Sequence, residues 1–182
     1  LAKTVFQVHG SDTDGLPLFN KRLSRSSVLK FFSEKPPCLV AMEACASAHY
    51  WGREIGKLGH EVKLIPPIYV KPFVKRQKND AADAEAISEA ASRPTMRFVA
   101  VKGEDQQAAC MVFKTRDLFV RQKTQLANAL RGHLAEFGVI APKGIVHLKR
   151  LAVVIEEDTG LLPASVLEYA GMILDGTVRG KL

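Results

Sequence analysis

Residues 38–67 read CLVAMEACASAHYWGREIGKLGHEVKLIPP, and their apolar residues follow the clearest structural pattern in the chain. The run at residues 38–42 is continuously apolar, as in a strand that is buried on both faces. From Ser47, which is placed to cap a helix, the apolar residues recur at helical spacing, and residues 60–65 return to a strand pattern. A strand, a helix and a strand in this order favour two parallel strands joined by a crossover helix.

Upstream of this unit, the sequence predicts an antiparallel hairpin and a short helix. Residues 4–9 alternate between inward and outward positions, and residues 16–23 resume a strand pattern after a turn that ends in an Asp-Gly pair. Ser26 or Ser27 is placed to cap the short helix, which two consecutive prolines then end.

Downstream, residues 68–78 are basic and are expected to form a loop, and Asn79 caps a predicted alanine-rich helix at residues 80–91. Residues 96–101 predict a last strand. Residues 104–137 predict one helix on the order of 50 Å long, which we expect to protrude or to pair with another chain. Its heptad pattern, weakened by polar members, consists of Ala108, Val112, Thr115, Phe119, Gln122, Leu126, Ala129 and His133.

The composition is that of a globular protein with a basic surface. Of the 182 residues, 47% are hydrophobic and 25% are charged, which excludes disorder of the whole chain, a collagen-like repeat and a mostly membrane-buried protein. The net charge of +7 and the isoelectric point near 9.4 favour a polyanionic partner. Three cysteines do not make a disulfide framework and fit a reducing cytosol.

Three carboxylates are the candidates for chemistry. Glu43 directly follows a buried strand, at the end where open α/β sheets form their sites. Asp80 and Asp83 are three residues apart on one helix face, which places their Cβ atoms roughly 5–6 Å apart. Magnesium prefers carboxylate oxygens, so these acids are suited to metal-dependent phosphoryl transfer. The alternative is that the aspartates only stabilise a helix start and that Glu43 only ends a strand.

Basic side chains accompany these acids. One group lies directly before Asp80, and another follows the predicted long helix. Such a run of charges usually forms only a solvated face, but two basic stretches beside an acidic cluster favour contact with a phosphate backbone. The first group is Lys71, Lys75, Arg76 and Lys78, and the second is Lys114, Arg116, Arg121, Lys123 and Arg131.

Four segments together resemble one family: residues 40–49 (VAMEACASAH), 59–67 (GHEVKLIPP), 71–84 (KPFVKRQKNDAADA) and 125–144. Their sequence is similar to that of the DEDD-type insertion-sequence transposases, which are related to the Piv and MooV DNA invertases. The resemblance extends over residues 1 to about 144.

The resemblance implies an α/β fold of the RNase H-like or RuvC-like type, in which helices flank a mixed sheet and a long protruding helix follows. It also implies a catalytic site of four acids, in the order Asp, Glu, Asp, Asp, that binds Mg²⁺. Glu43 matches the second acid, Asp80 the third and Asp83 the fourth. The first acid would directly precede Leu1 together with most of the first strand, so we expect weak metal binding and low stability in this chain.

Members of the family also have a C-terminal domain with a nucleophilic serine, and a structured RNA guides some of them. Residues 145–182 are too short for that domain, and no motif supports Ser165 as the nucleophile. We therefore expect a truncated RuvC-like domain at residues 1–103, a coiled-coil helix at residues 104–144 and a helical tail after it.

The resulting hypothesis is a fragment of a DNA transposase or site-specific recombinase that is inactive alone and uses Mg²⁺ as its cofactor. Its expected partners are DNA, a guide RNA and further copies joined through the long helix, in the bacterial cytoplasm near the nucleoid. Two alternatives remain: a nucleic-acid-binding module without catalysis, and a dimerising remnant of a decayed element. The residues expected to bind nucleic acid are Lys71, Lys75, Arg76, Lys78, Arg121, Lys123 and Arg131.

Overall fold

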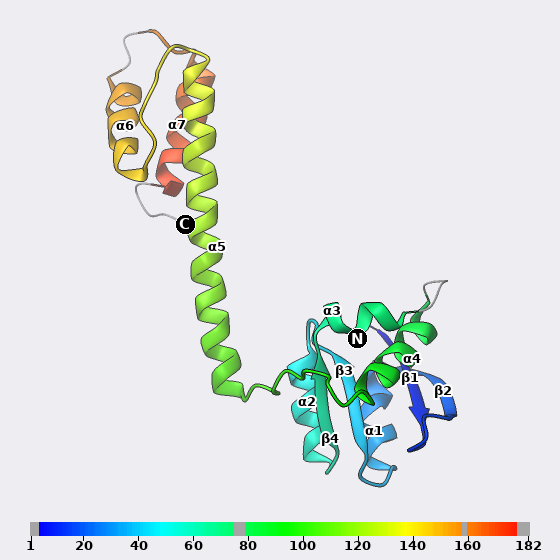
Figure 1. Ribbon diagram of the computed structural model, residues 1–182. Helices are drawn as coiled ribbons and strands as arrows, with labels where there is room; N and C mark the ends of the chain where they lie inside the picture. The colour runs from blue at the N-terminus through cyan, green and yellow to red at the C-terminus, as the bar shows by residue number, and fades with distance from the viewer. Residues whose placement is uncertain (1–3, 75–78, 158–159, 178–182) are drawn as a thin grey trace. The chain divides into compact units, whose positions relative to one another are not determined.

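The computed structural model contains two compact units (Figure 1). The first is Leu1–Gln107 and the second is Ala108–Leu182, so the boundary falls within one long helix, α5 (Glu104–Ala135). Each unit has a hydrophobic core of its own. The division into three parts that the sequence suggests stays a prediction. The residues that the structure describes are 4–74, 79–157 and 160–177.

The parallel pair in the first unit is formed by β3 (Leu39–Glu43) and β4 (Glu61–Ile65), which pair in an uninterrupted register. The crossover between them is α2 (Ala48–Lys57). This helix buries Trp51 and Ile55, which are 3% and 1% exposed. The predicted strand–helix–strand unit is therefore confirmed, and its helical spacing reflects one buried face.

Ser47 stands directly before α2 but does not cap it as predicted. Its backbone is left-handed, with a φ of 69°, and its side chain makes no capping hydrogen bond among the described residues. The backbone closes this turn instead, because the N–H of Ala48 donates to the carbonyl oxygen of Cys45 at 3.1 Å.

The predicted antiparallel hairpin is formed by β1 (Val5–Ser11) and β2 (Pro17–Ser24). The Oδ1 atom of Asp12 stabilises its turn by accepting hydrogen bonds from two backbone N–H groups, at 3.0 and 2.8 Å. Phe19 on β2 lies across Gly10 on β1, where a Cβ atom would approach the phenyl ring to 2.3 Å. A glycine at this position therefore allows the close contact between the strands.

The two strand pairs are not hydrogen-bonded to each other, so the described strands form two small sheets rather than the expected single mixed sheet. One core nevertheless connects the pairs and includes α1 (Val28–Ser33) and α2. Helix α4 (Asp80–Ala91) packs against both β1 and β3. The buried members of this core are Phe6, Val28, Phe32, Val40, Met42, Ala48, Trp51, Ile55 and Leu64.

The segment after β4 differs from the loop expected at residues 68–78. Its described part forms two short helical turns, α3 (Pro67–Val70) and η2 (Lys71–Phe73). Val70 is 4% exposed and packs in a small core that also contains Ile65. Pro67 opens the first turn, where its fixed φ suits a helix start, so burial and a proline together shape this segment.

Residues 96–101 do not form the strand that the sequence predicts. They make a single antiparallel bridge, in which the N–H of Val99 donates to the carbonyl oxygen of Leu64 at 2.8 Å. Val101 packs against Gly52 of α2, where a Cβ atom would lie 2.9 Å from the valine side chain. Met96, Val99 and Val101 are therefore partly buried by side-chain packing rather than by a continuous ladder.

The long helix α5 is close to its prediction and ends two residues earlier. Residues 111–125 are all exposed, whereas the following turns pack against α6 (Leu148–Glu156) and α7 (Ala164–Thr177). None of the described helices combines the length and apolar character needed to cross a membrane. The core of the second unit is Ala127, Leu130, Leu134, Val139, Leu148, Leu151, Leu162, Ala170 and Leu174.

Candidate functional site

Glu43 is the last residue of β3 and is half-buried. The apolar residues before it hold the strand in the core, and the next residue continues the connection to β4, because the N–H of Ala44 donates to the carbonyl oxygen of Ile65 at 2.8 Å. The backbone that carries the Glu43 carboxylate is therefore fixed at the carboxyl end of a parallel strand, as the sequence predicts.

Asp80 and Asp83 lie in the first turn of α4. Asn79 caps this helix as predicted, because its Oδ1 atom accepts a hydrogen bond from the N–H of Ala82 at 2.8 Å. Asp80 is exposed and Asp83 is half-buried. Acidic side chains at a helix N-terminus are favourable without any ligand, so their position alone does not assign them a chemical role.

The first unit holds all three acids, and α4 packs against the strand that ends at Glu43. No described cation forms an ion pair with Glu43, Asp80 or Asp83. Carboxylate oxygens such as theirs are the type of ligand that Mg²⁺ prefers. Within the described part of the chain, however, no three His, Cys, Asp or Glu side chains gather closely enough to hold a metal ion. The ligand set stays a prediction.

The predicted basic group before α4 is only partly described. Lys71 is exposed at the start of η2. Lys75, Arg76 and Lys78 lie outside the described residues.

The predicted basic residues of α5 fall into two groups. Arg121 and Lys123 are exposed. Arg131 is half-buried, and its guanidinium donates to Asn128 Oδ1 at 3.1 Å and to the carbonyl oxygen of Gly144. Arg131 therefore attaches the segment after α5 to the helix, whereas Arg121 and Lys123 are accessible to a partner.

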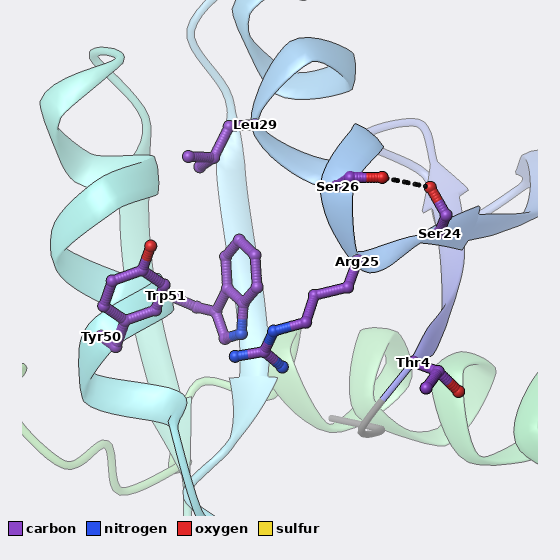
Figure 2. A pocket seen from close by; sticks show the side chains of 7 residues that line it. All are labelled: Thr4, Ser24, Arg25, Ser26, Leu29, Tyr50 and Trp51. Atoms are coloured by element: carbon purple, nitrogen blue, oxygen red, sulfur yellow. Dashed lines mark hydrogen bonds between the residues drawn. The ribbon is translucent and has the colours of Figure 1, made fainter.

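The residues around Arg25 and Trp51 were not singled out by the sequence patterns, although they line an open pocket in the first unit (Figure 2). The only local signal is a Ser-Arg-Ser-Ser run at residues 24–27. Trp51 lies on the apolar face of α2, so the sequence pattern predicts a core residue. The pattern does not indicate that Trp51 also lines a pocket.

The chain matches a family model for DEDD-type transposases, described as a transposase, over residues 1–139. This match covers well over half of the 182 residues. The chain therefore belongs to the DEDD-type insertion-sequence transposase family, as its motifs predicted.

Curated relatives agree with this assignment. The y4pF/y4sB protein of Sinorhizobium fredii is 51% identical over 88% of the chain and 41% of its own length. The transposase for insertion sequence element IS1328 of Yersinia enterocolitica is 49% identical over 86% of the chain and 47% of its own length. The transposase for insertion sequence element IS1111A of Coxiella burnetii is 41% identical over 79% of the chain and 40% of its own length. The chain thus spans less than half the length of each of these relatives.

Proposed function

We propose that the chain is part of a DNA transposase and that Glu43, Asp80 and Asp83 belong to its metal-binding catalytic site. The placement of the three acids supports this proposal: one ends a parallel strand, and two open a helix that packs against that strand. Sites of open α/β sheets form at this end of the strands. The family match supports the same function but does not identify the acids.

Two different features of the fold support such a role for the three acids. The ladder between β3 and β4 fixes the backbone of Glu43. The Asn79 cap fixes the first turn of α4 and so the backbone of Asp80 and Asp83. A bound divalent ion, Mg²⁺ in this proposal, would stabilise negative charge at a scissile phosphate. The first acid of the series and the serine nucleophile of the proposed mechanism are not assigned to any residue of this chain.

The same proposal assigns the two strand pairs to one RNase H-like sheet. Their common core and the packing of α4 across β1 and β3 support this assignment, since a helix that contacts both strands spans the interval between them.

We further propose that the transposase binds DNA, a guide RNA and further copies of itself. Exposed basic residues such as Lys71, Arg121 and Lys123 support the nucleic-acid partners. Exposed apolar side chains along α5 support self-association through this helix. They are Met111, Val112, Phe113, Leu118, Phe119 and Val120.

The test replaces each acid by its amide in the complete transposase, as Glu43→Gln, Asp80→Asn and Asp83→Asn. We expect each change to reduce Mg²⁺-dependent strand transfer on the order of a hundredfold or more, because a metal-binding carboxylate is lost. Calorimetric titration with Mg²⁺ should show weaker binding in the same variants, and circular dichroism should show unchanged folding.

Glu54→Gln is the matched control, because Glu54 is a carboxylate on α2 that pairs with Lys57 at 2.7 Å instead of belonging to the proposed site. This variant should keep full strand transfer. Strand transfer by the three amide variants at the wild-type rate would refute the catalytic assignment.

A nucleic-acid-binding module without catalysis is the second candidate, because no three-ligand metal cluster is found among the described side chains. It predicts DNA affinity that falls steeply with salt and does not change in Glu43→Ala. Mg²⁺-dependent strand transfer by the complete protein would exclude it.

A further inference from the structure

An open pocket of about 680 Å³ lies in the first unit, where the start of β1, the turn after β2 and helix α2 meet (Figure 2). Its wall carries hydroxyl, guanidinium and aromatic side chains, and none of the lining side chains is acidic. The lining residues that matter here are Thr4, Ser24, Arg25, Ser26, Tyr50 and Trp51.

Trp51 contributes a hydrogen-bond donor that lacks an acceptor among the described residues. Its side chain is 3% exposed, and edge-to-face contacts with Phe6 and Tyr50, at centroid distances of 5.1 and 5.2 Å, fix the indole. The Nε1–H group is buried and has no hydrogen-bond partner among the described atoms. Buried donors are almost always paired, so this one indicates a missing acceptor.

Arg25 lies over the same indole. Figure 2 shows Arg25 beside the indole of Trp51. The guanidinium carbon of Arg25 is 5.0 Å from the centroid of Trp51 and 5.9 Å from that of Phe6. No carboxylate in the described ranges forms an ion pair with it. The aromatic rings therefore attract the guanidinium, and its N–H groups are not engaged by a described carboxylate, so they can donate to an oxygen-rich ligand. Because Arg25 is exposed, it is free to shift and admit a ligand to Nε1.

Three serine hydroxyls order the turn that carries Arg25. Ser24 Oγ lies 3.0 Å from Ser26 Oγ and 2.9 Å from Ser27 Oγ, and the Ser27 hydroxyl donates to the carbonyl oxygen of Ser24 at 2.9 Å. This network limits the positions of the backbone around Arg25. It also leaves a hydroxyl group of Ser26 at the pocket wall.

We propose that this pocket binds a phosphate group, held by the Arg25 guanidinium and the Trp51 Nε1–H, with the hydroxyls of Ser26 and Thr4 at its edge. The charged oxygens of a phosphate accept hydrogen bonds. Two of them can accept parallel hydrogen bonds from one guanidinium. The phosphate belongs either to a nucleic-acid backbone or to a small phosphate compound. Binding to a nucleic-acid backbone rests on the proposed function, whereas binding of a phosphate group as such does not.

The test uses the fluorescence of Trp51, which is the one tryptophan of the chain. Inorganic phosphate is titrated into the 182-residue protein at constant ionic strength, and a saturable change in emission is expected. Arg25→Gln should weaken the apparent affinity at least about tenfold, because it removes the charge and the paired donors. Arg22→Gln is the matched control, since Arg22 is an exposed arginine of β2 that does not line the pocket.

Arg25→Lys keeps the charge and should also bind phosphate more weakly, which guards against a folding defect in the glutamine variant.

Stronger binding of a twelve-nucleotide oligothymidylate, with the same dependence on Arg25, would identify the nucleic-acid backbone as the source. Binding of phosphate and thymidine monophosphate alone would identify a small compound. No emission change with any probe, or equal losses in Arg25→Gln and Arg22→Gln, would overturn the proposal. Loss of binding when the chain is extended upstream of Leu1 would overturn it as well.

Discussion

At the scale of single residues, Asn79 determines how the two candidate aspartates are presented. Its backbone is extended, with φ and ψ of −145° and 159°, and its side chain accepts from the N–H of Ala82 at 2.8 Å. The bond satisfies one of the free N–H groups of the first helical turn, which is the turn that contains Asp80 and Asp83.

Replacement of Asn79 by alanine should lower the free energy of unfolding by about 1 kcal/mol, because the capping bond is lost. Asn79→Asp should restore most of that stability, since its carboxylate accepts the same bond and suits the helix dipole. Urea denaturation monitored by circular dichroism measures the free energy of unfolding of both variants. Equal stability of the alanine and wild-type proteins would show that the cap does not contribute.

At the scale of elements, α5 contains an exposed segment and a packed segment. Residues 111–125 are exposed, and the six apolar side chains among them lie outside both cores. From Ala127 onward, α5 packs against α6 and α7. A helix that packs only at its C-terminal end and exposes apolar residues before it is suited to a partner along the exposed segment.

We expect the double variant Phe113→Glu and Phe119→Glu to convert a self-associated chain into a monomer, because charges would enter the apolar contact. Gln125→Glu is the control, since it adds a charge at an exposed polar position of the same helix. Sedimentation velocity distinguishes the two. A wild-type chain that is already monomeric at all concentrations would refute association through α5.

At the scale of the whole molecule, the net charge of +7 predicts that the proposed binding of nucleic acid depends on ionic strength. Each contact with a duplex phosphate contributes about 0.9 to the slope of log affinity against log salt. The combined variant Arg121→Gln and Lys123→Gln should therefore reduce the slope by about two if both residues contact phosphates.

Fluorescence anisotropy with a labelled duplex at several salt concentrations measures this slope. Lys57→Gln is the control, because Lys57 already pairs with Glu54 and this interaction raises the pKa of the lysine. An unchanged slope in the double variant would place the DNA elsewhere on the protein.

The sequence predicted the elements whose signals are local. The β3–α2–β4 unit, the β1–β2 hairpin, the Asn79 cap and most of α5 follow from the spacing of apolar residues and from turn chemistry within short segments. The position of Glu43 at a strand end follows in the same way, because the strand is a continuous apolar run. The family assignment is confirmed, since it rests on motifs that are themselves contiguous.

Contacts between distant segments were decided only by the tertiary structure. His60 is 5% exposed, bonds the carbonyl oxygen of Phe32 through Nε2 at 2.9 Å and accepts from the N–H of Cys38 through Nδ1 at 3.2 Å. Arg131 holds the carbonyl of Gly144. Residues 96–101 form one bridge instead of a strand.

The pocket of Arg25 and Trp51 depends in the same way on packing, because its two main donors are brought together from β2–α1 and from α2. The spacing of the hydrophobic residues specifies which face of an element is buried, because burial of apolar side chains away from water is favourable. It does not specify which element covers the face or which polar atoms meet there. The sequence alone therefore established the elements and the candidate acids, and the packing of those elements decided which side chains became structural and which remained open to a ligand.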